Sequence, residues 1–200
     1  MKTQLFKFAC LIICLLTIAP NCHAGSKWKA KHVVLIGLDG WGAYSVEKAN
    51  IPHIKQLMND GSYTLTKRSV LPSSSAVNWA SMFMGAGPEL HGYTTWNSST
   101  PDLPSKDGIF PTIFQLLRET DPKAEIGTFY EWVGIKYLVD TLAVNKYNQG
   151  INYEKYPTEL CEKAVKYIKE KKPTLTLIAW DNPDHVGHKE GHDTPAYYHK

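Results

Sequence analysis

The chain has 200 residues, an apolar share of 43% and a formal net charge of +3. This length is enough for one domain with a hydrophobic core. No block of Lys and Arg is present, which argues against a nucleic-acid-binding surface. The richest basic stretch, 163–172, alternates with apolar residues and is typical of the solvated face of a helix.

Residues 1–24 have the pattern of a signal peptide. Lys2 and Lys7 form a basic start, residues 8–18 form an apolar stretch too short for a comfortable membrane span, and Ala24 fits a cleavage site. Asn21 precedes Cys22 where a lipoprotein signal needs a small residue, so a lipid anchor is the less favoured alternative. We therefore expect a periplasmic or secreted protein with no transmembrane span after signal removal.

Cysteine usage gives the mature chain no internal disulfide. Three of the four cysteines lie in the signal segment, and only Cys161 remains after its removal. Cys161 falls in a segment of amphipathic helical pattern, where we expect it to be a small packed residue.

Hydrophobic patterning predicts strands alternating with helices after residue 25. In chain order it predicts a strand at 32–39, a helix at 51–60, a strand at 63–70, helices at 75–84 and 111–120, a strand at 124–132, a helix at 157–171, a strand at 174–180 and the start of a helix at 194–200. The continuous apolar run at 32–39 is typical of a strand buried on both faces. The alternation predicts an α/β fold, an open mostly parallel sheet with helices on both faces.

Two sites along this pattern carry candidate chemistry. Asp39 ends the first predicted strand, where a carboxylate suits a metal ion or phosphate chemistry, with a turn cap as the alternative. Ser73, Ser74 and Ser75 precede the helix predicted at 75–84, and a hydroxyl at a helix start favours a bound anion. A plain N-cap needs only one of these serines. A nucleophilic serine here would need a metal ion or a base, and no Ser-His-Asp arrangement or Gly-x-Ser-x-Gly elbow is evident.

A cluster of potential metal ligands follows the strand predicted at 174–180. Asp184, His185 and His188 fall within five residues, in what we expect to be a loop. A carboxylate with imidazoles suits a divalent metal, zinc above all. A His-rich surface turn is the alternative.

Four ordered motifs resemble the alkaline phosphatase superfamily, and most closely its nucleotide pyrophosphatase/phosphodiesterase branch. They are Gly37-Leu38-Asp39-Gly40, Ser75 before Asn78, Gly85-x-x-Pro88-Glu89-x-His91-Gly92, and Asp184-His185-x-Gly187-His188. The resemblance covers the chain from about Lys31 to its end.

The resemblance implies a secreted phosphoric ester hydrolase with two zinc ions that clamp an in-line phosphoryl displacement. It implies that Ser75 is the nucleophile and forms a covalent phospho-enzyme. Asp39 and Ser75 would bind one zinc ion, and Asp184 and His188 the second, with His185 beside them rather than among the ligands. Asn97, after a one-residue shift of the match, would contact a phosphate oxygen.

The implied substrate is a small phosphate ester or a nucleotide, and not a nucleic-acid duplex. Trp96 and Trp132 could stack on a base or sugar, although a core position is the favoured interpretation. A sulfatase of the same superfamily is disfavoured because residues 73–78 lack the Pro and Arg of that branch's motif.

Two departures from the family pattern keep alternatives open. Pyrophosphatase members more often carry Thr where this chain has Ser75, and Ser is the choice of phosphomonoesterase members. The family also takes an Asp-His pair and a further His, all after the Asp184 motif, as zinc ligands. We therefore expect residues 25–200 to be the N-terminal part of one phosphoesterase domain, nearly inactive by itself. A truncated member that only binds a ligand is the remaining alternative.

Overall fold

The structure is a computed structural model that describes residues 30–96, 98–102, 110–149 and 156–199. All of its helices and strands belong to one unit, His32–Lys200. The signal-peptide prediction for residues 1–24 and the assignment of Asn97 lie outside the described residues. Among the described residues, no helix combines the length and apolar character that crossing a membrane requires.

Helices separate all of the described strands, with five of them between the first strand and the second. In chain order they are β1 (Val33–Leu38), α2 (Ser45–Lys48), α3 (Pro52–Asp60), α4 (Ser75–Met84), α5 (Pro88–His91), α6 (Ile113–Thr120), β2 (Ile126–Tyr130), α7 (Ile135–Leu138), β3 (Lys146–Gln149), α8 (Tyr156–Lys171), β4 (Leu175–Trp180), α9 (Asn182–Glu190) and α10 (Pro195–Tyr198). Threonine side chains cap the starts of two of these helices. The Thr112 side chain accepts from the Gln115 N–H at the start of α6, and Thr194 caps α10 in the same way.

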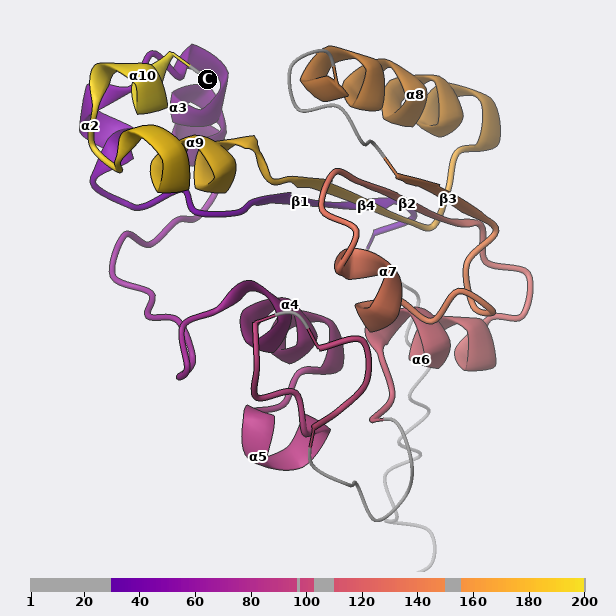
Figure 1. Cartoon of the computed structure of the whole chain (residues 1–200). Coiled ribbons are helices and arrows are strands. Elements are labelled where there is room, and N and C mark those ends of the chain that lie inside the picture. Colours follow the sequence, from indigo (N-terminus) through magenta and orange to yellow (C-terminus); the bar gives the residue numbers. More distant parts are fainter. Residues whose placement is uncertain (1–29, 97, 103–109, 150–155, 200) are drawn as a thin grey trace, which may run out of the picture. The chain divides into compact units, whose positions relative to one another are not determined.

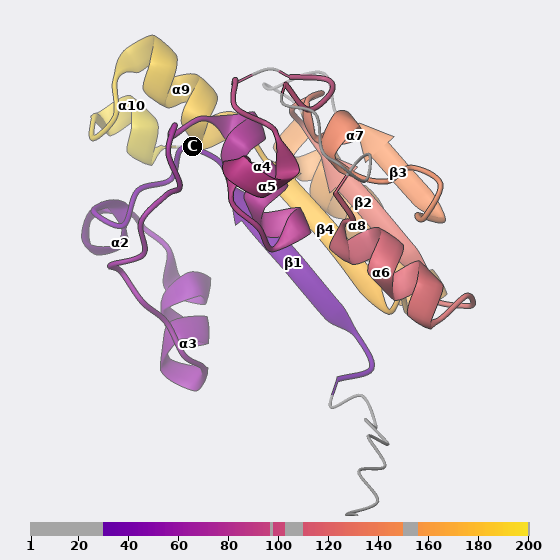
Figure 2. The ribbon, with the colours of Figure 1, turned by 90° about the horizontal axis from the view of Figure 1, so that it is seen from below.

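The four described strands form one parallel sheet in the order β1-β4-β2-β3. In its register Leu38 pairs with Trp180, and Tyr130 pairs with Ala179. The carboxyl ends of β1, β4 and β2 therefore meet at one edge of the sheet. Figure 2 shows α4 and α9 at this same end of β1.

Helices cover both faces of the sheet, which confirms the predicted fold class. Helix α8 lies across one face, and α4, α6 and α7 lie across the other (Figure 1). Leu160 and Ala164 of α8 pack against Phe129 and Ile178. The opposite face carries the larger core, whose buried residues include Phe83, Phe114, Ile126, Tyr130 and Leu177.

The prediction that residues 32–39 form a strand buried on both faces is wrong. β1 has β4 as its only neighbour in the described sheet, and Val34 and Ile36 are 45% and 55% exposed. The strand predicted at 63–70 is also wrong, because these residues form no ladder and are exposed up to Ser69. The polar edge strand β3 was not predicted. Cys161 is exposed on α8, so the expectation of a packed thiol is wrong as well.

Candidate active site

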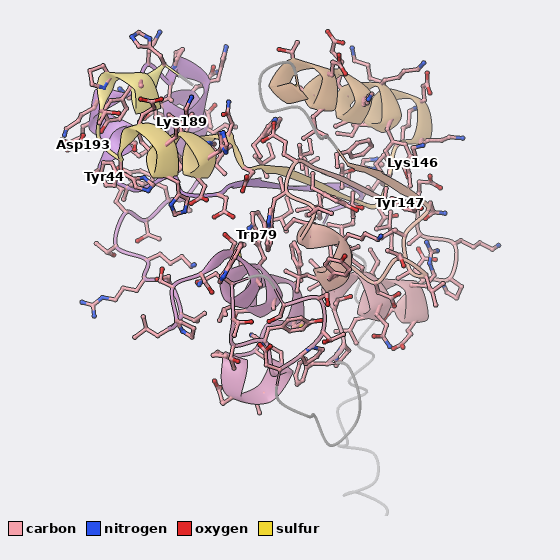
Figure 3. All side chains as sticks on the ribbon, in the orientation of Figure 1. Tyr44, Trp79, Lys146, Tyr147, Lys189 and Asp193 are labelled. Carbon is pink, nitrogen blue, oxygen red and sulfur yellow. The ribbon has the colours of Figure 1, made fainter. Side chains whose placement is uncertain are left out.

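The first site residue is Asp39, which directly follows β1. Its N–H donates to the Trp180 carbonyl at 2.8 Å, which extends the β1–β4 ladder by one residue. Its Oδ2 accepts from the Trp79 indole Nε1–H at 2.9 Å, and its Oδ1 accepts from the Gly40 N–H at 3.0 Å. Figure 3 shows Trp79 between α4 and β1. One hydrogen bond to each oxygen fixes the direction of the carboxylate.

The backbone of the turn after Asp39 is hydrogen-bonded to Tyr197, which lies more than 150 positions later in the sequence. The Tyr197 hydroxyl of α10 donates to the Gly40 carbonyl at 2.7 Å and accepts from the Gly42 N–H at 3.2 Å. Tyr197 is buried, and its neighbours in space include Tyr44, whose ring stacks on it. Beside them, Lys48 forms an ion pair with Asp193 at 2.7 Å (Tyr44 and Asp193 are labelled in Figure 3). Contacts between residues 40–48 and residues 193–197 thus help to fix the position of Asp39.

Ser75 is the first residue of α4. Ser74 before it has extended N-cap geometry but forms no side-chain cap hydrogen bond. The loop that leads into the helix is ordered instead by Asn78, whose Oδ1 accepts from the Val70 N–H at 2.9 Å. Apolar residues of α4 pack into the core, so the helix axis is fixed. The Ser75 hydroxyl therefore lies at the positive end of a well-anchored helix dipole.

Asp184 and His188 lie on a helix, α9, and not in the predicted loop. Their spacing of four residues places them on one helix face, with His188 Nε2 at 3.3 Å from Asp184 Oδ2. The prediction of a loop rested on the position of the cluster directly after a strand, and a helix begins there instead. Pro183 stands in the first turn, where a helix tolerates proline.

Asp39 and Asp184 approach each other closely. A Cβ atom added to Gly40 would lie 2.5 Å from Asp184 Cα, so only glycine permits this contact between the β1 turn and α9. Burial raises the pKa of Asp184, the negative charge of Asp39 raises it further, and His188, His192 and His185 oppose the shift. The two carboxylates thus repel each other across a site that a cation would stabilise.

One open cavity of about 1310 Å³ brings the site residues together. Asp39, Ser75, Asp184 and His188 all line it. Its wall also includes His185, His192, Lys67, Trp41, Trp96 and Trp132. The four residues that the motifs single out are 149 positions apart at their extremes, from Asp39 to His188, and the fold gathers them at the carboxyl end of β1 and β4.

These residues fit a divalent metal by type. Two carboxylates, an imidazole and a hydroxyl are the oxygen and nitrogen donors that zinc accepts, and the repulsion between Asp39 and Asp184 favours a cation there. Within the described ranges, however, no three His, Cys, Asp or Glu side chains are grouped so that they could hold one ion.

Other residues of the motifs have different surroundings. His91 is fully buried, with Nε2 2.9 Å from Ser81 Oγ and Nδ1 accepting from the Tyr93 N–H at 3.1 Å, so its place is structural. Glu89 is exposed.

The expectation that Trp96 is a core residue is wrong, since it is 66% exposed on the cavity wall. Trp132 is half-buried, lines the cavity and packs against the core.

Sequence reasoning missed three residues near the site. Trp79 binds the Asp39 carboxylate, Glu131 binds the start of α9, and the His192 ring contacts the rings of His188 and Tyr197. His192 had a sequence signal, because it follows His188 by four positions. The partners of Trp79 and Glu131 are 40 and 50 or more positions away, so no local pattern indicates them.

The parallel sheet has Asp39 at the end of β1 and Ser75 at the start of α4, and this is the fold of the alkaline phosphatase superfamily. Residues 33–200 match the family model described as type I phosphodiesterase / nucleotide pyrophosphatase, and the chain belongs to this family. This confirms the resemblance that the four motifs indicated, and it supports a hydrolase.

Curated relatives agree with this assignment. The chain is 28% identical over 192 residues to venom phosphodiesterase 2 of Crotalus adamanteus, covering 86% of this chain and 23% of the relative. It is 26% identical over 188 residues to ectonucleotide pyrophosphatase/phosphodiesterase family member 1 of Rattus norvegicus, covering 86% of this chain and 20% of the relative. The chain thus spans less than a quarter of the length of these proteins.

Solved structures share the fold. An inactive form of murine ectonucleotide pyrophosphatase/phosphodiesterase 5 in complex with AMP matches with a TM-score of 0.67 at 20% identity, over 85% of this chain and 48% of that one. Phosphonoacetate hydrolase from Sinorhizobium meliloti in complex with phosphonoformate matches with a TM-score of 0.59 at 20% identity, over 84% of this chain and 50% of that one.

Proposed function

We propose that the whole protein is a secreted, metal-dependent phosphoric ester hydrolase of the phosphodiesterase/nucleotide pyrophosphatase type, with Ser75 as its nucleophile. The observation that carries the proposal is the convergence of Asp39, Ser75, Asp184 and His188 on one cavity. These residues come from three separate segments, and the family to which the chain belongs acts on phosphate esters by its description.

Each residue has a role that its surroundings support. Asp39 and Ser75 would hold one zinc ion, and Asp184 and His188 would hold the second. When bound, the two ions would supply Lewis-acid activation of the attacking oxygen and of the leaving oxygen. The Ser75 oxygen attacks phosphorus and gives up its proton as the bond from phosphorus to the leaving oxygen breaks, and the leaving oxygen departs as an alcohol that carries one proton. Water then cleaves the phosphoserine ester, which releases the phosphate and restores the Ser75 hydroxyl. The start of α4 stabilises the negative charge of the phosphoryl group.

The metal sites need ligands that the described residues do not supply. Since the chain spans about half of the solved relatives, we propose that the remaining ligands come from outside these 200 residues. The 200-residue chain alone should then hydrolyse esters very slowly. Asn97, which falls outside the described residues, remains our proposed phosphate contact.

A nucleotide pyrophosphate or a phosphodiester is the favoured substrate. The cavity, at about 1310 Å³, exceeds the ~300–1,000 Å³ of common small-molecule sites, and it is far larger than a phosphate group requires. Its wall offers the Trp41 and Trp96 rings and the Lys67 ammonium group for the rest of such a substrate. A phosphomonoester remains the alternative, because Ser75 stands where monoesterase members carry serine. Export to the periplasm or beyond rests on the signal pattern of residues 1–24.

Ser75→Ala in the full-length protein tests the proposal. Hydrolysis of bis(4-nitrophenyl) phosphate should fall by about 10³-fold or more, since no other group replaces the nucleophile. Ser73→Ala, which removes a neighbouring hydroxyl, is the matched control and should stay within about threefold of the parent. A Ser75→Ala enzyme that keeps most of its activity contradicts the assignment. The ratio of activities on bis(4-nitrophenyl) phosphate and 4-nitrophenyl phosphate decides between diesterase and monoesterase.

A further inference from the structure

Glu131 is a buried acid that has no part in the proposed chemistry. It directly follows β2, is 2% exposed, and does not line the cavity. Its Oε2 accepts from the Asp181 N–H at 2.7 Å and from the Asn182 N–H at 3.1 Å. Burial raises its pKa, while these two backbone hydrogen bonds lower it. A buried carboxylate is costly, so its retention requires a compensating contact, and both of its hydrogen bonds go to the start of α9.

The first turn of helix α9 has no side-chain cap from its own N-cap residue. Asp181 is the N-cap residue but forms no side-chain cap hydrogen bond, and Pro183 has no N–H. The first N–H groups of a helix need acceptors from outside the helix. Glu131, at the end of the neighbouring strand β2, supplies this acceptor. Its negative charge also suits the positive end of the helix dipole.

We propose that Glu131 is a positioning residue, which fixes the start of α9 and thereby sets Asp184 and His188 against Asp39. Asp184 lies two positions after Asn182, in the same first turn, and the close contact with Gly40 leaves little room for it to shift. The expectation that Glu131 affects metal binding rests on the proposed function. The expectation that Glu131 orders the first turn of α9 does not depend on that function.

Glu131→Ala and Glu131→Gln in the full-length protein test whether the acceptor oxygen of Glu131 positions α9. Removal of a group that orients a metal ligand typically lowers metal affinity by about 10–100-fold. We expect Glu131→Ala to weaken zinc binding by about this factor, measured by competition with a chromophoric chelator. In metal-free protein, the first-turn amides of α9 should exchange faster with deuterium. Glu131→Gln keeps an acceptor oxygen and should restore both properties to near the parent values.

Leu160→Ala is the control for a merely structural effect. Leu160 is fully buried in α8 against Phe129 and Ile178, and its side chain, unlike that of Glu131, has no acceptor atom for the N–H groups of α9. This variant should lose stability but keep zinc affinity and the slow exchange of α9. If Glu131→Ala does not fold, Glu131→Asp takes its place, since a shorter carboxylate cannot reach both N–H groups.

Two results overturn the proposal. One is a Glu131→Ala protein with unchanged α9 exchange and unchanged zinc affinity. The other is a Leu160→Ala protein that loses zinc affinity as much as Glu131→Ala does. A parent protein that binds no zinc contradicts the proposed metal site, and the exchange measurement then still decides the role of Glu131.

Discussion

At the scale of single residues, the contact between Gly40 and α9 decides how the two acidic groups meet. Gly40 has φ of +67°, and an added Cβ would collide with the backbone and side chain of Asp184. Gly85, at the end of α4, has φ of +63° but nothing within 4 Å of an added Cβ. A side chain at either glycine would therefore be strained by the positive φ, and only at Gly40 would it also collide with Asp184.

Gly40→Ala should separate the Asp39 and Asp184 carboxylates although it removes no functional group. Both Gly40→Ala and Gly85→Ala should cost about 1–2 kcal/mol of unfolding free energy from the left-handed backbone. Gly40→Ala should cost more and should also weaken zinc binding by about tenfold or more, as expected when ligands are misplaced. Chemical denaturation and zinc titration of the two variants measure this. Equal zinc affinities in the two variants would show that the contact does not control the site.

The candidate site residues could be singled out from sequence because motif residues stand at predicted element ends. Asp39 follows a strand, and Ser75 starts a helix at the residue predicted. The carboxylate pair itself could not be predicted, since it depends on the close packing of Gly40 against Asp184. Trp79 and Glu131 act through hydrogen bonds across the fold, which only the three-dimensional structure contains.

At the scale of elements, periodicity predicted α4 and β4 well because their apolar residues face a core. The same reasoning failed where tertiary contacts decide. Residues 63–70 alternate but find no partner strand within the described residues, and the polar strand β3 forms because β2 offers an edge. Helix α9 forms despite Pro183 and Gly187, with its first N–H groups bound by Glu131.

His91 connects α5 to α4 and makes this pair of helices sensitive to pH. Its Nδ1 accepts from the Tyr93 N–H, so the neutral ring carries its proton on Nε2, toward Ser81. Burial lowers the pKa of His91 below its usual value of 6.5, against a smaller opposing effect of Glu89. The unfolded chain therefore takes up a proton before the folded protein does.

Stability should fall as the pH drops below about 6.5 and level off below the lowered pKa of His91. The slope from this one group is at most about 1.4 kcal/mol per pH unit, and its effect vanishes above the unfolded pKa. Denaturant unfolding between pH 5 and 8 should show this component in the parent protein and in His53→Gln, which changes an exposed histidine, but not in His91→Gln. A parent and a His91→Gln protein with parallel pH profiles would contradict the prediction.

At the scale of the whole molecule, the exposed sheet edge at β1 and the metal ligands that the described residues lack both bear on the active unit that we propose. β1 exposes apolar side chains and pairs with one strand among those described, and the chain spans about half of the solved relatives. The prediction of a fully buried β1 considered the apolar run alone, and burial depends on what packs beside it. The active unit that we propose is therefore the whole protein.

The central claim is that Ser75 takes the phosphoryl group. The most direct measurement is acid quenching of the full-length enzyme during turnover of a phosphodiester, followed by peptide mass spectrometry. We predict one phosphate on the peptide that contains Ser75, absent from Ser75→Ala and from enzyme without substrate. Turnover with no phosphate on Ser75, or with phosphate on another residue, would contradict the account.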